Sequence, residues 1–396
     1  MIEGHVHPDF WRVAKVFERI LPRSGNGGAA ICVYHRGEKV VDLWGGTRDE
    51  HGNPWQADTL SLSYSTTKGV ASTLLHVLAD RGLLDYDEPV AHYWPEFAAA
   101  GKEEITVRQL MCHEAGLYSI RAVVDDARQM LDWDYMVDAL AHATPAHIPG
   151  TAHGYHALTY GWLVGELAQR VTDKPFGELL QTLLAVPLDL DGLYVGLPEN
   201  QMERRAQLIP STKRNDSRQL GRTVRNAKRL NRAFKALRIP IDLAKGAEAL
   251  MPKNMQDLDL NSKAAAAACI PALNGMFTAR SLAKLYAVLA NGGRFDGVTL
   301  LSRETLERAT EVQNRGVGKV IPIPMHWRLG YHRVATIGHK TPRAFGHSGY
   351  GGSGAWADPD RNLAVGLTLN SGVGTPFGDL RIVRIGTAAC DAAKHR

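Results

Sequence analysis

Apolar positions near the N-terminus follow first a helical period and then a strand period. Residues 8–20 carry apolar side chains at the spacing of an amphipathic helix. Residues 29–46, AAICVYHRGEKVVDLWGG, contain two β-rich runs on either side of residues 36–39, and a pair of glycines ends the second run. This pattern predicts one helix followed by a β-hairpin.

The middle of the chain, from about Ser65 to Ala268, changes to a mainly helical pattern that proline and glycine interrupt. Directly after Ser65, apolar residues recur at helical spacing, and Gly82 stands where a C-cap is expected. Further helices are predicted at about residues 158–171 and within residues 271–295.

The strand pattern returns near the C-terminus. Residues 344–359 and 362–372 predict a hairpin that turns around residues 358–362, and a last helix is expected at about residues 378–393. Strands at both ends of the chain, with helices between them, indicate one antiparallel sheet built from the two termini.

The predicted fold class is therefore α/β (α+β), an antiparallel sheet flanked by N- and C-terminal helices, with a mostly helical inserted domain. We expect residues 1–75 and 265–396 to form the sheet domain and residues 76–264 to form the helical insert. A chain of 396 residues is long enough for this division.

Composition narrows the class of protein further. The chain is 44% apolar and 22% charged, and no stretch approaches the roughly 18 apolar residues of a membrane span. The N-terminus lacks the pattern of a secretory signal, and the four cysteines are widely scattered. We therefore expect a cytoplasmic protein with reduced thiols and no transmembrane segment.

The net charge of +5 hides a local excess of basic residues. Residues 201–240 hold twelve lysines and arginines against Glu203 and Asp216, a balance of 12 − 2 = +10. The segment could contact a partner, an anionic ligand or a membrane surface, or it could be a solvated helix packed on its own domain. No nucleic-acid motif accompanies it, so we expect no nucleic-acid partner.

The first candidate for chemistry is the pair Ser65 and Lys68. A serine hydroxyl is a poor nucleophile at neutral pH and needs a nearby base. Residues three apart on a helix lie about 5–6 Å from each other at Cβ, so Lys68 could take the proton of Ser65. The alternative is a serine N-cap followed by a solvated lysine.

Two further segments carry candidate residues. Tyr155 lies in a loop just before a predicted helix, where it could be catalytic or a half-buried structural tyrosine. Residues 346–354 contain five glycines, which suits either a strand approached closely by a ligand or a tightly bent strand. His153 and His156 have the spacing of half a zinc site, but no matching ligand set accompanies them, so no metal and no cofactor are expected.

In this order the three segments resemble the serine β-lactamase and penicillin-binding protein superfamily, in which S-x-x-K is a defining motif. Within it, the chain is most similar to the class C β-lactamase-like esterases, or family VIII carboxylesterases. Residues 110–117, LMCHEAGL, are similar to the L-L-x-H-x-S-G-L segment of that family. The resemblance covers roughly nine-tenths of the chain, and residues 201–250 are its least typical part.

The resemblance implies a role for each matching residue. Ser65 would be the acylated nucleophile, Lys68 its base, and Tyr155 would share the base role and protonate the leaving group. The backbone N–H groups of Ser65 and Tyr350 would form the oxyanion hole. The strand residues His347, Ser348 and Gly349 would bind the substrate.

Two positions depart from the β-lactamase pattern. Ala157 stands where Tyr-x-Asn has asparagine, and His347 stands where the strand motif has lysine. A mostly neutral histidine suits a neutral ester better than an anionic β-lactam. We therefore expect hydrolysis of short- to medium-chain esters, with a β-lactamase, D-amino-acid peptidase or acyltransferase, and a catalytically silent binding protein, as alternatives.

Overall fold

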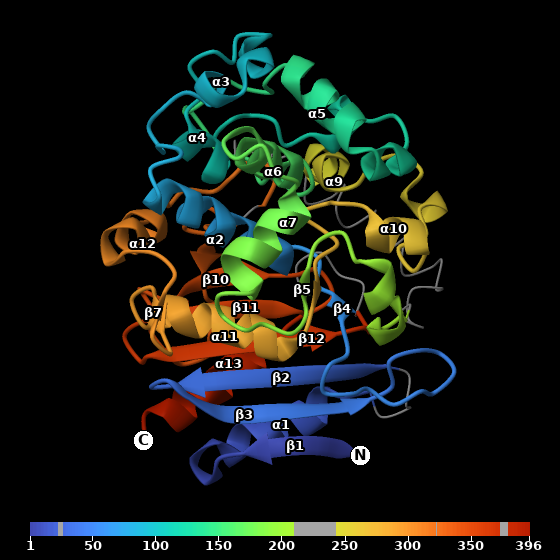
Figure 1. The fold of residues 1–396 in the computed structure, drawn as a ribbon, viewed down its shortest axis with the longest axis vertical. Coiled ribbons are helices and arrows are strands. Elements are labelled where there is room, and N and C mark those ends of the chain that lie inside the picture. Colours follow the sequence, from blue (N-terminus) through green and yellow to red (C-terminus); the bar gives the residue numbers. More distant parts are fainter. Residues whose placement is uncertain (23–26, 210–242, 322, 373–378) are drawn as a thin grey trace, which may run out of the picture.

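A seven-stranded antiparallel sheet forms one half of the molecule, with strand order β1-β3-β2-β12-β11-β10-β9 (Figure 1). The computed structural model describes residues 1–22, 27–209, 243–321, 323–372 and 379–396. The strands are β1 (Ile2–Val6), β2 (Gly28–His35), β3 (Glu38–Gly46), β9 (His332–Arg333), β10 (Phe345–Ser348), β11 (Gly354–Asp358) and β12 (Leu363–Leu369).

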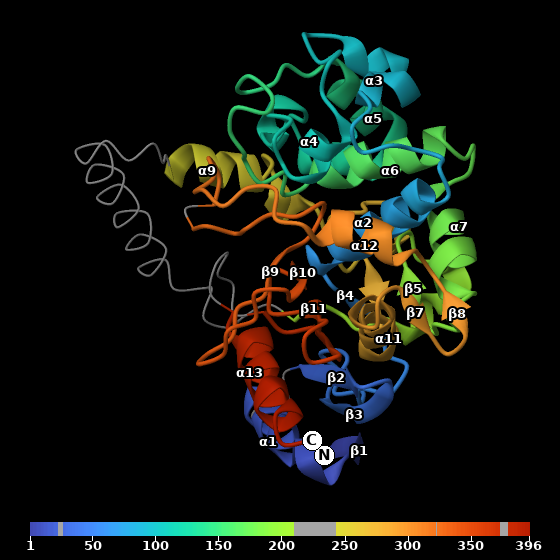
Figure 2. The same cartoon turned by 90° about the vertical axis from the view of Figure 1, so that its left-hand side faces the viewer.

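Helices cover both faces of this sheet. The terminal helices α1 (Trp11–Ile20) and α13 (Arg381–Ala393) pack side by side on one face, while α11 (Ala279–Ala290) lies on the other (Figure 2). The side chains of strand β12 alternate between these two helical layers. Its Leu363 and Val365 join the core under α1 and α13, whereas Gly366 faces α11, where an added Cβ would meet the Ala279 carbonyl oxygen at 2.6 Å.

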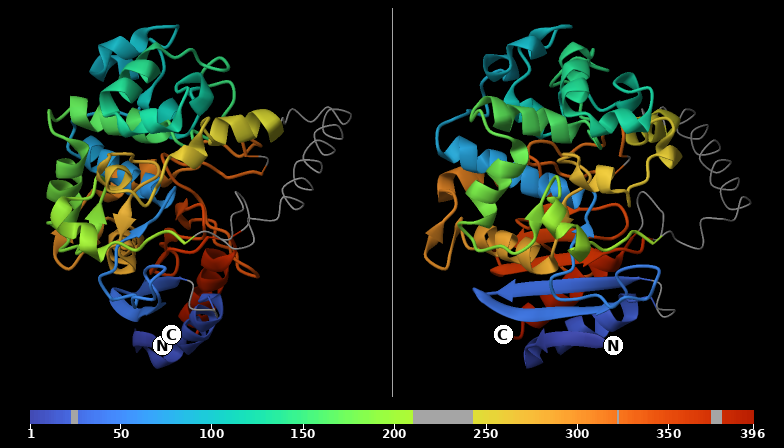
Figure 3. Two further views of the ribbon diagram at one scale, coloured as in Figure 1. Left: turned by 90° about the vertical axis from the view of Figure 1, so that its right-hand side faces the viewer. Right: turned by 45° about the vertical axis from the view of Figure 1, so that its right-hand side comes forward.

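The other half of the molecule is mostly helical and lies above the sheet in Figures 1 and 3. Short strands connect the halves: β4 (Ser61–Leu62) and β5 (Leu193–Tyr194) pair with β6 (Met276–Phe277), and β7 (Arg294–Phe295) pairs with β8 (Val298–Thr299). The helices of this half are α3 (Val90–Tyr93), α4 (Val107–Met111), α5 (Trp133–His142), α6 (Tyr160–Arg170), α7 (Phe176–Leu180), α9 (Leu243–Leu250), α10 (Lys263–Ala267) and α12 (Arg303–Thr310).

Helix α2 (Thr66–Asp80) runs between the two halves and is buried from residue 66 to residue 78. It packs on α6 above and on β10 below. Polar side chains on such a helix need partners, because an unpaired buried polar group is costly. Three of them bond tyrosine hydroxyls of other segments: Ser72 to Tyr160 (2.8 Å), Thr73 to Tyr331 (2.7 Å) and His76 to Tyr86 (2.8 Å).

The structure confirms the predicted fold class and most of the elements. The helix expected within residues 271–295 is shorter than this range, because it begins only at Ala279, after the two-residue strand β6. Strand β1 was not expected at all. The basic run at residues 222–239 lies outside the described residues. Within the described part of the chain, no helix has both the length and the apolar character to cross a membrane.

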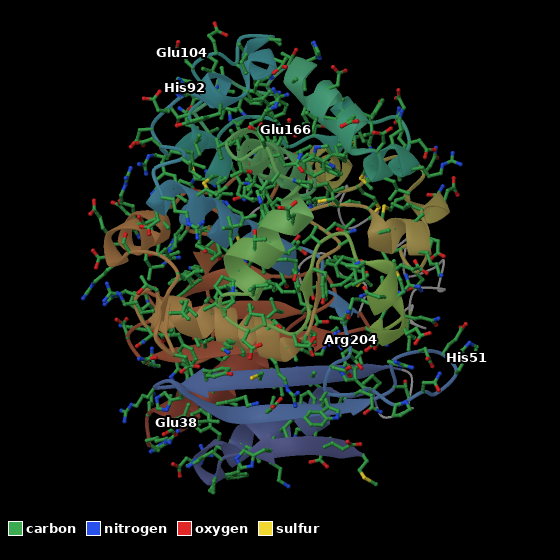
Figure 4. The ribbon with its side chains drawn as sticks, viewed as in Figure 1. Glu38, His51, His92, Glu104, Glu166 and Arg204 are labelled. Carbon is green, nitrogen blue, oxygen red and sulfur yellow. The ribbon has the colours of Figure 1, made fainter. Side chains whose placement is uncertain are left out.

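The described start of the basic segment is held by internal ion pairs. Arg204 lies at the end of a 3-10 helix (Glu199–Arg204), and its guanidinium bonds the carboxylate of Asp191 at 2.8 Å and lies 3.2 Å from that of Asp58 (Figure 4). Arg205 donates to the Ser262 carbonyl oxygen at 3.0 Å. These two residues therefore serve the fold.

Candidate active site

Ser65 lies at the sharp entry into α2. Strand β4 ends at Leu62, Ser63 donates its N–H to the Gly275 carbonyl oxygen at 2.9 Å, and Tyr64 has a φ of 46° in the left-handed region. Ser65 occupies the N-cap position of α2, but its side chain makes no capping hydrogen bond. Lys68 is buried, so the alternative of a solvated lysine is wrong.

Lys68 is fully buried and points at the serine. Its Nζ lies 3.0 Å from Ser65 Oγ and 3.0 Å from the carbonyl oxygen of Ala272. Burial holds the pKa of the Lys68 amine well below its usual value of 10.5. Among the described residues, no carboxylate pairs with this amine. A lowered pKa favours the neutral amine, which is the form that the predicted role as a base requires.

Tyr155 approaches the same oxygen atom from the loop before α6. Its hydroxyl donates to Ser65 Oγ at 2.9 Å, and Lys68 Nζ lies 5.1 Å from the centre of its ring. The ring stacks on Trp327 with centroids 5.2 Å apart and an interplanar angle of 8°. Burial raises the pKa of the Tyr155 phenol, so the resting group keeps its proton.

His347 occupies the edge of the site on β10 and is uncharged. Its Nδ1 lies 3.0 Å from the Ser348 carbonyl oxygen, while its buried Nε2 has no partner among the described residues. Burial, with His332 and Lys68 nearby, holds the pKa of His347 well below 6.5. His332 Nε2 accepts the N–H of Ser348 at 3.1 Å.

The turn after β10 docks on the start of α2. Ser353 Oγ donates to the Ser63 carbonyl oxygen at 2.8 Å, and the rings of Tyr64 and Tyr350 meet at 5.5 Å between centroids. Within the described chain, the N–H groups of Ser65 and Tyr350 donate no hydrogen bond. Both amides are therefore free to donate, which the predicted oxyanion hole requires.

Glycine at position 349 is required by the protein itself. A Cβ there would lie 2.2 Å from Ser353 Oγ and 2.4 Å from the Ser63 carbonyl oxygen. The bent-strand interpretation therefore accounts for this glycine, because atoms of the protein itself lie too close to leave room for a side chain.

His113 was not predicted as a site residue, and its only signal was its place in residues 110–117. It contacts Tyr155 edge-to-face at 5.1 Å. The sequence left Trp327 open between shaping an acyl or alcohol pocket and packing in the core, and in the structure its ring stacks on Tyr155. Among the residues that the structure describes, no three potential ligands are arranged to hold a metal.

The arrangement suits acyl transfer. It places one hydroxyl between a buried amine and a phenol, and the N–H of the same serine donates no hydrogen bond within the described chain. A nucleophile, a base and a proton donor within hydrogen-bond reach of one another are the elements of covalent catalysis.

Comparisons with known proteins agree with this chemistry. The Beta-lactamase family matches residues 13–389. Esterase/beta-lactamase LipL of Mycobacterium tuberculosis is 40% identical over 375 residues, which are 93% of this chain and 82% of LipL. A crystal structure of a family VIII carboxylesterase is 37% identical with a TM-score of 0.85, covering 99% of this chain and 100% of the other. A penicillin-binding protein homologue from Caulobacter crescentus is 33% identical with a TM-score of 0.83, over 99% and 100% of the chains.

Proposed function

The chain belongs to the beta-lactamase family, and from this premise we propose that it hydrolyses carboxylic esters through an acyl-enzyme on Ser65. One observation carries the proposal. Ser65 Oγ lies 3.0 Å from the Lys68 amine and 2.9 Å from the Tyr155 hydroxyl. The solved carboxylesterase and the esterase LipL support ester hydrolysis on this scaffold.

Acylation follows from these contacts. Ser65 Oγ bonds to the ester carbonyl carbon while its proton passes to Lys68, and the electron pair of the carbonyl bond moves to oxygen. The N–H groups of Ser65 and Tyr350 stabilise that oxygen. The intermediate then collapses, and the departing alcohol oxygen takes the Tyr155 proton. The Lys68 ammonium returns a proton to the phenolate, which restores both groups.

Deacylation reverses the roles with water in place of the alcohol. Water gives one proton to the Tyr155–Lys68 pair as its oxygen attacks the acyl carbon. Ser65 Oγ leaves and regains a proton from the same pair. The products are a carboxylic acid and the free enzyme.

The electrostatics of the site favour an uncharged substrate. His347, Ser348 and Gly349 form the edge of the site in this proposal, and His347 is neutral because burial lowers its pKa. Among the described residues of this strand motif, none thus supplies a fixed positive charge for a carboxylate. Short- to medium-chain neutral esters fit this environment best.

The decisive experiment replaces the nucleophile. We expect Ser65→Ala to lower turnover of p-nitrophenyl butyrate by at least about 10³-fold, as loss of a catalytic triad residue does. Intact mass should show an acyl adduct on the wild type and none on the variant. Ser302→Ala, at the N-cap of α12, is the control and should keep turnover. Full activity in folded Ser65→Ala would refute the proposal.

A β-lactam substrate is the second candidate, favoured by the similarity to Esterase/beta-lactamase LipL. Nitrocefin, D-alanine amides and acyl acceptors, tested beside the simple ester, separate the β-lactamase, peptidase and acyltransferase alternatives. A large kcat/KM preference for one of them would replace ester hydrolysis. A protein that no acyl probe labels would instead be a silent binding protein.

Location, partners and domain division complete the proposal. All four cysteines are free, which supports a cytoplasmic, reducing location. The partner we propose is a small-molecule ester.

We also propose residues 1–75 and 265–396 as one folding unit, with residues 76–264 inserted into it. Cell fractionation and expression of the joined terminal segments test these two points.

A further inference from the structure

His113 lies against Tyr155 but takes no part in the mechanism above. It follows α4 with a φ of 70°, in the left-handed region that side-chain-bearing residues seldom adopt, and it is 1% exposed. Such a conformation persists only where the surrounding structure imposes it, and it is a reason to look for a function.

His113 accepts hydrogen bonds from the residues on both sides of Tyr155. Its carbonyl oxygen accepts the N–H of Gly154 at 2.9 Å, and its Nδ1 accepts the N–H of His156 at 3.3 Å. One residue therefore fixes the backbone immediately before and immediately after the phenol.

The neighbouring ring fixes the tautomer of His113. Leu117 donates its N–H to His156 Nε2 at 3.0 Å, so the ring hydrogen of neutral His156 is on Nδ1. That Nδ1 lies 3.3 Å from Nδ1 of His113, which must then be the acceptor. Burial lowers the pKa of both rings, that of His156 to about 3, so both are neutral at pH 7.

Ring contacts add to the backbone contacts. His113 meets Tyr155 edge-to-face at 5.1 Å and Trp327 edge-to-face at 4.4 Å. Since Trp327 also stacks in parallel on Tyr155, the three rings restrict one another.

We propose that His113 is a positioning residue that holds the Tyr155 hydroxyl within reach of Ser65 Oγ. This inference rests on the proposed role of Tyr155, because His113 acts only through that phenol. A misplacement of about 1 Å can cost about 10²-fold in rate, so a small drift of Tyr155 would be costly.

Two substitutions separate the acceptor from the backbone conformation. His113→Gly tolerates the positive φ but removes Nδ1, whereas His113→Asn tolerates it and offers a side-chain oxygen as acceptor. We expect kcat for p-nitrophenyl butyrate to fall about 10- to 100-fold in His113→Gly, with KM within about twofold, and His113→Asn to recover most of the loss. If His113→Gly does not fold, His113→Ser replaces it, because its hydroxyl is too short to reach the His156 N–H.

A destabilised control and a double substitution complete the experiment. Met136→Ala, buried in α5, should lower Tm while kcat stays unchanged. In a Tyr155→Phe background, His113→Gly should add no further loss. Normal kcat in His113→Gly, equal loss in His113→Asn, or additive loss with Tyr155→Phe would overturn the inference. Full activity of Tyr155→Phe alone would instead refute the proposed function.

Discussion

Lys68 combines complete burial with a hydrogen bond to the nucleophile, and this pairing determines its chemistry. An amine with a lowered pKa is neutral above that pKa and charged below it. The neutral form is the base, so kcat/KM should fall as the pH drops through the lowered pKa. A pH–rate profile of the free enzyme measures this limb.

Lys68→Arg tests the same point by substitution. A guanidinium stays protonated at any working pH and cannot accept the Ser65 proton. We expect kcat/KM to fall by about 10²–10⁴-fold, the usual contribution of a general base. Lys39→Arg, a substitution at the half-exposed partner of Asp42, serves as the control. An active Lys68→Arg enzyme would remove lysine from the mechanism.

Helix α5 ends on a second buried lysine. Lys102 Nζ donates to the carbonyl oxygens of Ala99 (2.5 Å), Ala141 (2.9 Å) and Ala143 (2.7 Å), two of which belong to the end of α5. Lys102→Met keeps the volume but leaves these acceptors without a donor. We expect the free energy of unfolding to fall by about 1–3 kcal/mol, measured by urea titration. Lys174→Met, at an exposed ion pair, should cost less than about 1 kcal/mol. Equal stability of the two variants would contradict the expectation.

The same lysine gives a pH dependence of stability. Burial lowers the pKa of Lys102 to about 8 from the ordinary 10.5. Between these values the unfolded chain still binds a proton that the folded chain has released, so stability rises with pH. The wild type should therefore gain stability relative to Lys102→Met from about pH 8 to 10.5. Unfolding titrations of both proteins across this range measure the difference, and parallel curves would contradict it.

The start of α13 supports the turn after β10. Arg381 bonds the carbonyl oxygens of Gly351 (2.6 Å) and Ser371 (2.5 Å) and pairs with Asp379. Because Gly351 follows Tyr350, we expect Arg381→Lys to misplace the Tyr350 amide and to lower kcat about tenfold, less than complete loss of an oxyanion donor. Exposed Arg384→Lys should have no effect. Steady-state kinetics compare the two, and normal kcat in Arg381→Lys would refute the link.

Across the whole molecule, some features could be read from the sequence and others could not. The helices and hairpins with long apolar periods were predicted, because one face of each is buried. Strand β1 escaped because Glu3, Gly4 and His5 are exposed at the edge of the sheet. Two-residue strands such as β6 carry no period. The Ser65–Lys68 pair is local, but His113 and His156 meet across 43 residues, which no spacing rule reveals.

The site depends on the complete fold, since Ser65 and Tyr155 come from segments 90 residues apart. One large core also joins side chains of α2 and α6 to those of β11. We therefore expect activity and tertiary structure to disappear at the same urea concentration. Parallel assays of esterase turnover and near-ultraviolet circular dichroism measure this, and early loss of activity would indicate a loosely held site.

Helix α2 exposes no face to solvent from residue 66 to residue 78. A library of variants randomised along α2 would yield few active proteins, because replacements there disturb either core packing or a hydrogen-bonded side chain. Changes that broaden the range of accepted molecules should thus accumulate in the surrounding loops. The sequence of the helix that follows the nucleophile should then stay constant while the sequences of the loops around it diverge.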